Sequence, residues 1–297
     1  MRARALLFAL LAAALAPSLA GADSVPAPET TITSSPPDPF ASTSATFDFT
    51  SDQADSTFAC ALDEQSFKRC TSPKTYTDVP EGLHTFFVFA VHNDRKDPTP
   101  AARTWTVDTT PPAPVKLQRP AVSYRKLTLT WALAPGTDHV VVLRSTRAKQ
   151  VASTQVYKGA GTSYVESKFL NAQYHAYRIR SYDKAGNVSS AVDVKVPASA
   201  LLLSPADGAR IHRPPTFRWR AVPRAHYYNI QLWQNGEKIL SLWPTSPKLK
   251  LAPTWTYKGR HYRLKPGRYI WFVWPGFGPP QKGIYGQPIG QSSFSVT

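Results

Sequence analysis

The sequence has few of the residues on which helices and thiol chemistry depend. Met occurs once, at the start of the chain, and Cys occurs twice among 297 residues. Long segments with the 3.6-residue period of an amphipathic helix are absent after the N-terminal region. With 28 Pro, 14 Phe, 13 Tyr and 8 Trp, the chain is instead rich in residues that form strands and turns. The composition therefore predicts an all-β fold.

The chain is also short of the constellations that carry catalysis. Residues 198–297 contain two carboxylates, Asp207 and Glu237, both in turn contexts. A glycosidase needs two carboxyl groups that face one cleft, so this region cannot form such a site by itself. The seven His are scattered, and no phosphate-binding loop, dinucleotide fingerprint or Gly-x-Ser-x-Gly elbow occurs. We therefore expect no catalytic residue, no metal site and no cofactor, in a protein that is not an enzyme.

A single long apolar run occurs, at residues 5–16, and it follows Arg2 and Arg4. The run is too short to span a bilayer, and small residues at Ala20 and Ala22 offer positions for cleavage. We therefore predict that residues 1–22 are a cleaved signal peptide and that the chain has no transmembrane segment. The mature protein is expected to be secreted and extracellular, with non-covalent association with the cell surface as an open option.

The two cysteines, Cys60 and Cys70, lie close together in this exported chain. In an oxidising compartment a close pair forms a disulfide more often than a reactive site, and no further soft metal ligands lie nearby. We predict that the two are bonded. The short loop implies a stabilisation of roughly 2–3 kcal/mol.

The stretch from Trp105 to Val115 marks a boundary between modules. Trp105 and Val107 alternate with polar residues as in a strand, and three prolines then hold the backbone extended, at Pro111, Pro112 and Pro114. Similar patterns of short strands and turns recur on either side. We predict tandem β-sandwich domains at residues 26–111, 112–197 and 198–297, with Pro-containing joints that limit bending.

Each of the three regions carries segments that resemble known modules. In order along the chain, these segments are Thr57-Phe58-Ala59-Cys60-Ala61-Leu62-Asp63, Gly82-Leu83-His84-Thr85-Phe86, Trp131, Tyr177-Arg178-Ile179-Arg180, Asp183-Lys184-Ala185-Gly186-Asn187-Val188-Ser189, Ser204-Pro205-Ala206-Asp207-Gly208 and Phe217-Arg218-Trp219. The first region resembles a bacterial immunoglobulin-like repeat, and the second a fibronectin type III module. The third is similar to immunoglobulin- or fibronectin-like sandwiches of secreted bacterial surface proteins. The resemblance implies three tandem immunoglobulin/fibronectin-like β-sandwich domains.

Charge is distributed unevenly over the three regions. Residues 23–111 contain 6 Lys and Arg against 13 Asp and Glu, residues 112–197 contain 13 against 4, and residues 198–297 contain 14 against 2. In the strand around Phe217 and Trp219, alternation places these two side chains inside and Arg218 and Arg220 outside. Two basic domains that follow an acidic one are expected to attract anionic polymers.

The third region also contains six of the eight Trp. Trp233, Trp243, Trp255 and Trp274 could form a platform on which sugar rings stack, or they could be core residues of a sandwich. Trp243 and Trp274 each precede a proline, which predicts that they lie at strand ends beside the Gly-rich segment 276–286.

These observations predict a secreted, non-enzymatic surface or matrix protein that acts as a spacer or adhesin. Its basic second and third domains would bind an anionic cell-wall or matrix polysaccharide, with Arg218 and Arg220 as candidate ligand-binding residues. The alternative is a carbohydrate-binding accessory protein that uses Trp233, Trp243 and Trp274. Protein partners stay open, and nucleic acid is disfavoured because the chain is exported.

Overall fold

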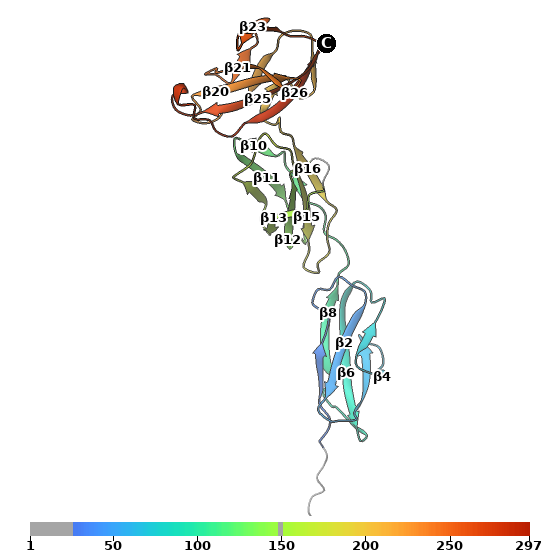
Figure 1. Cartoon of the computed structure of the whole chain (residues 1–297). Helices are drawn as coiled ribbons and strands as arrows, with labels where there is room; N and C mark the ends of the chain where they lie inside the picture. Colours follow the sequence, from blue (N-terminus) through green and yellow to red (C-terminus); the bar gives the residue numbers. More distant parts are fainter. Residues whose placement is uncertain (1–25, 148–150) are drawn as a thin grey trace, which may run out of the picture. The chain divides into compact units, whose positions relative to one another are not determined.

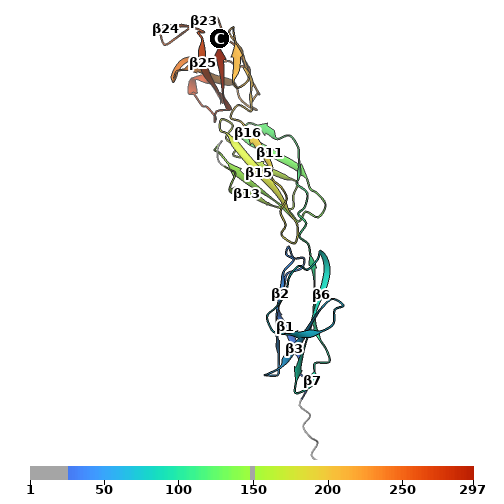
Figure 2. The same cartoon turned by 90° about the vertical axis from the view of Figure 1, so that its right-hand side faces the viewer.

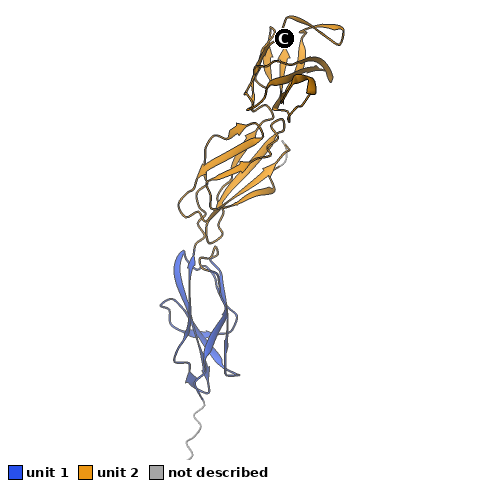
Figure 3. Cartoon of the chain, turned by 90° about the vertical axis from the view of Figure 1, so that its left-hand side faces the viewer, with its two compact units in different colours: residues 1–37, 43–107 blue, residues 38–42, 108–297 orange. Residues whose placement is uncertain are grey.

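The structure, a computed structural model, describes residues 26–147 and 151–297, which consist almost entirely of strands, turns and loops (Figure 1). The predicted signal peptide, residues 1–22, lies outside the described residues. The described chain divides into two compact units (Figure 3). One unit contains residues 38–42 and 108–297, and the other contains the remaining described residues up to Val107. The all-β fold predicted from composition is confirmed.

The first unit is a sandwich of two antiparallel sheets. One sheet has the strand order β1-β2-β5, and the other has the order β4-β3-β6-β7 with β8 paired to β6. The strands are β1 (Thr30–Ser34), β2 (Ala45–Ser51), β3 (Thr57–Leu62), β4 (Lys68–Cys70), β5 (Lys74–Tyr76), β6 (Gly82–His92), β7 (Arg95–Lys96) and β8 (Ala101–Val107). Alternation on β2 and β8 sends Phe47, Trp105 and Val107 into the core, where Phe47 stacks on Phe86 with ring centroids 4.2 Å apart.

The predicted disulfide between Cys60 and Cys70 is confirmed. Strands β3 and β4 form a hairpin in which Phe58 lies opposite Cys70, so the bond runs diagonally across the hairpin. The two Cα atoms are 5.9 Å apart, and the Cys60 side chain is buried. The bond closes the hairpin at the edge of the sheet whose central strand is β6.

The second unit contains two sandwiches. The first has one sheet of order β10-β11-β14, with β9 paired to β11, and a second sheet of order β13-β12-β15-β16. Its strands are β9 (Lys116–Leu117), β10 (Ala121–Ser123), β11 (Lys126–Ala132), β12 (His139–Ser145), β13 (Thr154–Gly159), β14 (Ser163–Glu166), β15 (His175–Tyr182) and β16 (Val192–Val196). Trp131 on β11 and Tyr177 on β15 are buried between the sheets.

The other sandwich of this unit has a three-stranded sheet, β17-β19-β22, and a five-stranded sheet, β18-β26-β25-β20-β21. Its strands are β17 (Leu202–Ser204), β18 (Ala209–Ile211), β19 (Thr216–Trp219), β20 (Tyr227–Gln234), β21 (Glu237–Leu242), β22 (Lys248–Lys250), β23 (Thr254–Tyr257), β24 (Arg260–Arg263), β25 (Gly267–Gly276) and β26 (Gly290–Val296). Strands β23 and β24 form a separate hairpin (Figure 2), and a short 3₁₀ turn, η1, covers Pro280–Lys282. All pairings are antiparallel except that of β18 with β26.

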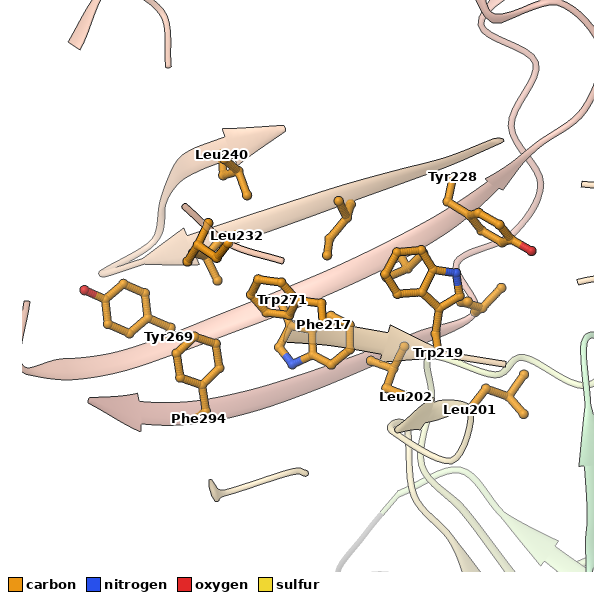
Figure 4. Packing of buried hydrophobic residues seen from close by; sticks show 14 of the residues in the cluster. Leu201, Leu202, Phe217, Trp219, Tyr228, Leu232, Leu240, Tyr269, Trp271 and Phe294 are labelled. Carbon is orange, nitrogen blue, oxygen red and sulfur yellow. The ribbon is translucent and has the colours of Figure 1, made fainter. Parts of the chain in front are cut away.

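The core of this last sandwich is aromatic. Phe217 and Trp219 on β19 face Trp271 and Tyr269 on β25, and all four side chains are buried (Figure 4). The prediction that Phe217 and Trp219 point inward is therefore confirmed, and Arg218 between them is exposed. The Tyr269 hydroxyl donates to the Lys265 carbonyl and accepts from the Lys265 amide, both at 2.9 Å, which fixes the entry to β25.

The two sandwiches of the second unit share a packed joint. Ala200 packs against the core of the first and Leu201 belongs to the core of the second, although the two residues are adjacent in the chain. Val122 contacts both cores. The Tyr124 hydroxyl donates to the Gln287 carbonyl at 3.2 Å, so a loop of the second sandwich also rests on the first.

Candidate ligand-binding groove

The eight Trp side chains fall into three groups by exposure. Trp105, Trp131, Trp219 and Trp271 are buried core residues, Trp233, Trp255 and Trp274 are half-buried, and Trp243 is 53% exposed. Some of the Trp side chains are therefore core residues, as one interpretation of the sequence predicts, and others are exposed enough to contact a ligand, as the other predicts. The side chains that reach solvent decide what the third region can bind.

Strand β25 explains why Trp271 and Trp274 have different environments. Tyr269, Trp271 and Val273 point into the sandwich, and Ile270, Phe272 and Trp274 point to the opposite side of the sheet. Trp274 lies within the strand, because Pro275 and Gly276 continue the pairing with β20. The prediction that Trp274 sits at a strand end is therefore wrong, because the Trp-Pro pair does not interrupt the sheet.

Side chains from two neighbouring strands meet on this outer face. Trp233 lies opposite Ile270, and Gln231 lies opposite Phe272. The ring centroids of Phe272 and Trp274 are 5.6 Å apart, and those of Trp233 and Phe272 are 6.4 Å apart at 75°. The rings thus form a continuous aromatic surface, but not a coplanar row.

A groove of about 510 Å³ follows this surface, and we call it the aromatic groove. Its lining residues are Gln231, Trp233, Asn235, Gly236, Arg268, Ile270, Phe272 and Trp274. The volume lies within the range of small-molecule sites in proteins. An open apolar groove of this size on an otherwise polar sheet face indicates a binding surface.

Polar side chains of β20 hold the groove in shape. The Trp233 indole donates to Gln231 Oε1 at 3.2 Å, and Gln231 Nε2 donates to Asn229 Oδ1 at 2.7 Å. Asn229 Nδ2 in turn donates to the Ser241 hydroxyl at 2.9 Å. This chain of hydrogen bonds orients the Trp233 ring before any ligand arrives, which lowers the entropy cost of binding.

Cations flank the aromatic groove. Arg268 is one of its lining residues, and Lys238 Nζ lies 5.7 Å from the centroid of the Trp233 ring. Both acidic residues of the third region have other partners: Asp207 accepts from the Ser293 amide, and the Glu237 carboxylate is 3.5 Å from Arg260. The groove therefore combines an aromatic floor with a positive edge.

The structure does not bring the other predicted site residues into the groove. Trp243 follows β21, and its indole donates to the Tyr285 hydroxyl at 2.6 Å. Arg218 lies on β19 in the opposite sheet, directly across from Lys248 on β22. Arg220 follows β19 and lines a different hollow, near the joint between the two sandwiches.

Two of the groove's lining residues, Trp233 and Trp274, were predicted from the sequence, and six were not: Gln231, Asn235, Gly236, Arg268, Ile270 and Phe272. A signal was present for Arg268 and Phe272, because they share the parity of Trp274 on one predicted strand. Trp255, a candidate for the stacking platform, instead packs within the sandwich and its hairpin. Its indole donates to the Ile239 carbonyl at 2.7 Å, and its ring stacks on Tyr262.

Within residues 26–147 and 151–297, no group of three or more His, Cys, Asp or Glu is arranged to hold a metal ion. No helix among these described residues is long and apolar enough to cross a membrane. The lining of the aromatic groove contains neither a carboxylate nor a histidine. The groove is therefore suited to binding through ring stacking, amide hydrogen bonds and positive charge.

Comparison with known proteins gives likeness of fold only. No family model and no curated protein matches the chain. Among solved structures, it is similar to fibronectin(III)-like modules of Clostridium thermocellum CbhA, with 20% identity and a TM-score of 0.42 over 56% of this chain and 92% of that one. It is also similar to the FN1–FN3 domains of chicken CNTN1, with 14% identity and a TM-score of 0.25 over 91% of this chain and 99% of that one. The chain's own sheets define it as a string of immunoglobulin/fibronectin III-like sandwiches.

Proposed function

We propose that this protein is an exported, non-enzymatic binding protein whose last sandwich holds an acidic polysaccharide of the cell envelope or matrix. The observation that carries the proposal is the aromatic groove, where Trp233, Phe272 and Trp274 face solvent beside Arg268. In this proposal the other two sandwiches act as spacer modules. The Cys60–Cys70 bond supports an oxidising, extracellular location.

The ligand class follows from the chemistry of the lining. Aromatic rings offer large rigid apolar faces, which suit the C–H faces of pyranose rings. The side-chain amide of Gln231 and the exposed Asn235 can bond hydroxyl groups at the ring edges. Arg268 and Lys238 supply charge for carboxylates, and a guanidinium group pairs well with a planar carboxylate.

The proposal that the groove binds rather than cleaves rests on the same lining. Hydrolysis of a glycosidic bond requires two carboxyl groups on either side of the scissile bond. Glu237, at the start of β21, has its carboxylate 3.5 Å from Arg260 and is not among the lining residues. The one other carboxylate among residues 198–297 is Asp207, which accepts a hydrogen bond from the Ser293 amide within β26.

The test is a titration of the whole protein with a uronic-acid polysaccharide and with a neutral glucan of similar length. Loss of one stacked ring costs about 0.5–1.5 kcal/mol, so we expect Trp233→Ala and Trp274→Ala each to weaken uronate binding roughly two- to tenfold. Trp243→Ala is the matched control, because this Trp is exposed but lies outside the groove. The Trp243→Ala variant should bind the uronic-acid polysaccharide as tightly as the unaltered protein does.

The salt dependence of binding distinguishes ion pairing from ring stacking. High salt and Arg268→Ser should both weaken uronate binding, because exposed charges interact over a Debye length of roughly 8–10 Å in ordinary buffer. Binding of the neutral glucan that is equally tight and insensitive to salt would instead favour the neutral carbohydrate-binding alternative. An equal loss in Trp243→Ala and Trp274→Ala, or no binding of either polymer, would exclude the groove as the site.

A further inference from the structure

A second hollow, of about 820 Å³, lies in the second unit beside the joint between its two sandwiches, and we call it the joint hollow. The β10–β11 hairpin of one sheet and the edge strand β16 of the other contribute to it, together with the segment that follows β19. Its polar lining residues are Arg119, Ser123, Lys126, Thr128, Lys195 and Arg220. The remaining lining residues are small or aliphatic, with no aromatic ring among them.

The charge in the joint hollow has a single sign. Four cationic side chains line it, and no Asp or Glu does. In the described parts of the chain, none of these four cations takes part in an ion pair. The neighbouring carboxylate on β16, Asp193, interacts electrostatically with Lys195, but it is held by Arg178 through two hydrogen bonds of 2.8 and 2.7 Å. The hollow therefore carries excess positive charge that can interact with an anionic ligand.

The backbone around the joint hollow is fixed by the fold. Ser123 pairs with Lys126 across the tight β10–β11 hairpin, and Lys195 pairs with Ala176 within β16 and β15. The Arg220 amide donates to the Leu201 carbonyl at 2.9 Å, next to the buried joint. Cations that are about a hundred positions apart in the sequence are therefore brought to one hollow by three segments with fixed backbones. Because these segments are already ordered, binding of a ligand costs less entropy than it would at a flexible site.

We propose that the joint hollow is a binding site for phosphate groups of a phosphodiester or polyphosphate chain. Tetrahedral phosphate accepts hydrogen bonds from several directions, whereas a planar carboxylate is matched best by one in-plane guanidinium group. Donors that converge from three segments fit the tetrahedral oxyanion. The volume exceeds that of one phosphate group, so the ligand is a chain with more than one phosphate.

The absence of aromatic lining in the joint hollow argues against single-stranded nucleic acid, which proteins hold by stacking bases on aromatic side chains. The occupant proposed here is therefore a phosphate chain without bases. Because Arg220 belongs to one sandwich and Lys195 to the other, binding links the two sandwiches across their joint. The site is separate from the aromatic groove, and the two ligands do not compete.

The experiment uses the whole protein with two probes, inorganic tripolyphosphate and poly(glycerol phosphate), and an oligothymidylate as the nucleic-acid arm. The test variant is Lys195→Ser/Arg220→Ser. The matched control is Arg218→Ser/Lys248→Ser, which removes the same charge from two exposed residues outside the hollow. Thermal unfolding confirms that both variants fold.

We expect the test variant to lose roughly tenfold in affinity for both phosphate probes, as for two exposed ion pairs near 0.7 kcal/mol each. The salt dependence of its binding should fall by about one ion per cation removed. The control should change affinity less than about twofold. Tripolyphosphate should also raise the unfolding temperature of the unaltered protein, because it binds the folded joint.

Equal losses in the two variants would overturn the proposal, because general charge would then account for binding. Absence of binding of both phosphate probes to the unaltered protein would also overturn it. Tighter binding of the oligothymidylate than of poly(glycerol phosphate) would mean that the occupant is nucleic acid. Trp274→Ala should leave phosphate binding unchanged, so failure of this site and failure of the aromatic groove are observed separately.

Discussion

Removal of the disulfide should destabilise the first unit by an amount that the structure specifies. The bond joins residues separated by 10 positions, so it closes a loop of roughly ten residues. In the chain-entropy model such a loop contributes about 2.7 kcal/mol at 25 °C, which is close to a hundredfold change in an unfolding equilibrium. The perturbation is the Cys60→Ala/Cys70→Ala variant, which removes the bond without leaving a free thiol.

Hydrogen exchange on the whole protein measures this effect with an internal control. Amides of β6, the strand that pairs with both β3 and β8, should exchange about a hundredfold faster in the variant when global opening limits exchange. Amides of β12 and β15, in the unit without cysteine, should keep their rates. Intact mass after alkylation should show no free thiol in the native protein.

Two outcomes would refute this reasoning. If the exchange rates of β6 amides changed less than about tenfold, the bond would not stabilise this unit by lowering the entropy of its unfolded chain. Equal acceleration in β6 and in β12 would mean that the two units do not unfold separately.

Three further outcomes are expected. Burial lowers the pKa of His84, but its hydrogen bonds to Asp63 and to the Pro80 carbonyl outweigh burial and raise the pKa above 6.5. Protonated His84 therefore stabilises the folded first unit. This contribution is complete below pH 6.5 and is lost as the pH rises through the folded-state pKa. The denaturant midpoint of the first unit should therefore be higher at pH 6 than at pH 8 through this group, and His84→Gln should reduce the difference; an unchanged difference would contradict this. Tyr269→Phe should destabilise the last sandwich by roughly 1–3 kcal/mol in denaturant titration, since two backbone groups lose their partner; a loss under about 0.5 kcal/mol, as at an ordinary surface site, would show that water replaces the hydroxyl. Gly286→Ala would push a Cβ into the Tyr124 hydroxyl and should speed proteolysis at residues 198–202, whereas unchanged cleavage would mean that the joint does not depend on this contact.

Much of the fold could be predicted from local pattern. The alternation of Phe217 and Trp219 with Arg218 correctly predicts which side chains are buried. Asn235 and Gly236 form the two-residue turn between β20 and β21, and both have the positive φ that this turn requires and that an Asn-Gly pair favours. These features follow from the residues themselves, because strand period and turn conformation depend on near neighbours.

The candidate sites required the tertiary structure. Trp271 and Trp274 are three positions apart, so the pattern alone places them on opposite faces of a strand. It does not say which face the other sheet covers. Packing against Phe217 buries Trp271 in the core, and Trp274 is left to line the groove.

Local sequence was enough to predict strands, module boundaries, the disulfide and the uneven charge, because each depends on residues close together in the chain. The exposure of each Trp side chain and the grouping of cations around one hollow depend instead on tertiary packing. Trp233 reaches Ile270 through strand pairing, and Lys195 reaches the hollow of Arg220 through a packed joint. Contacts of that kind join distant residues, and their geometry is set by how whole sheets pack rather than by any local period.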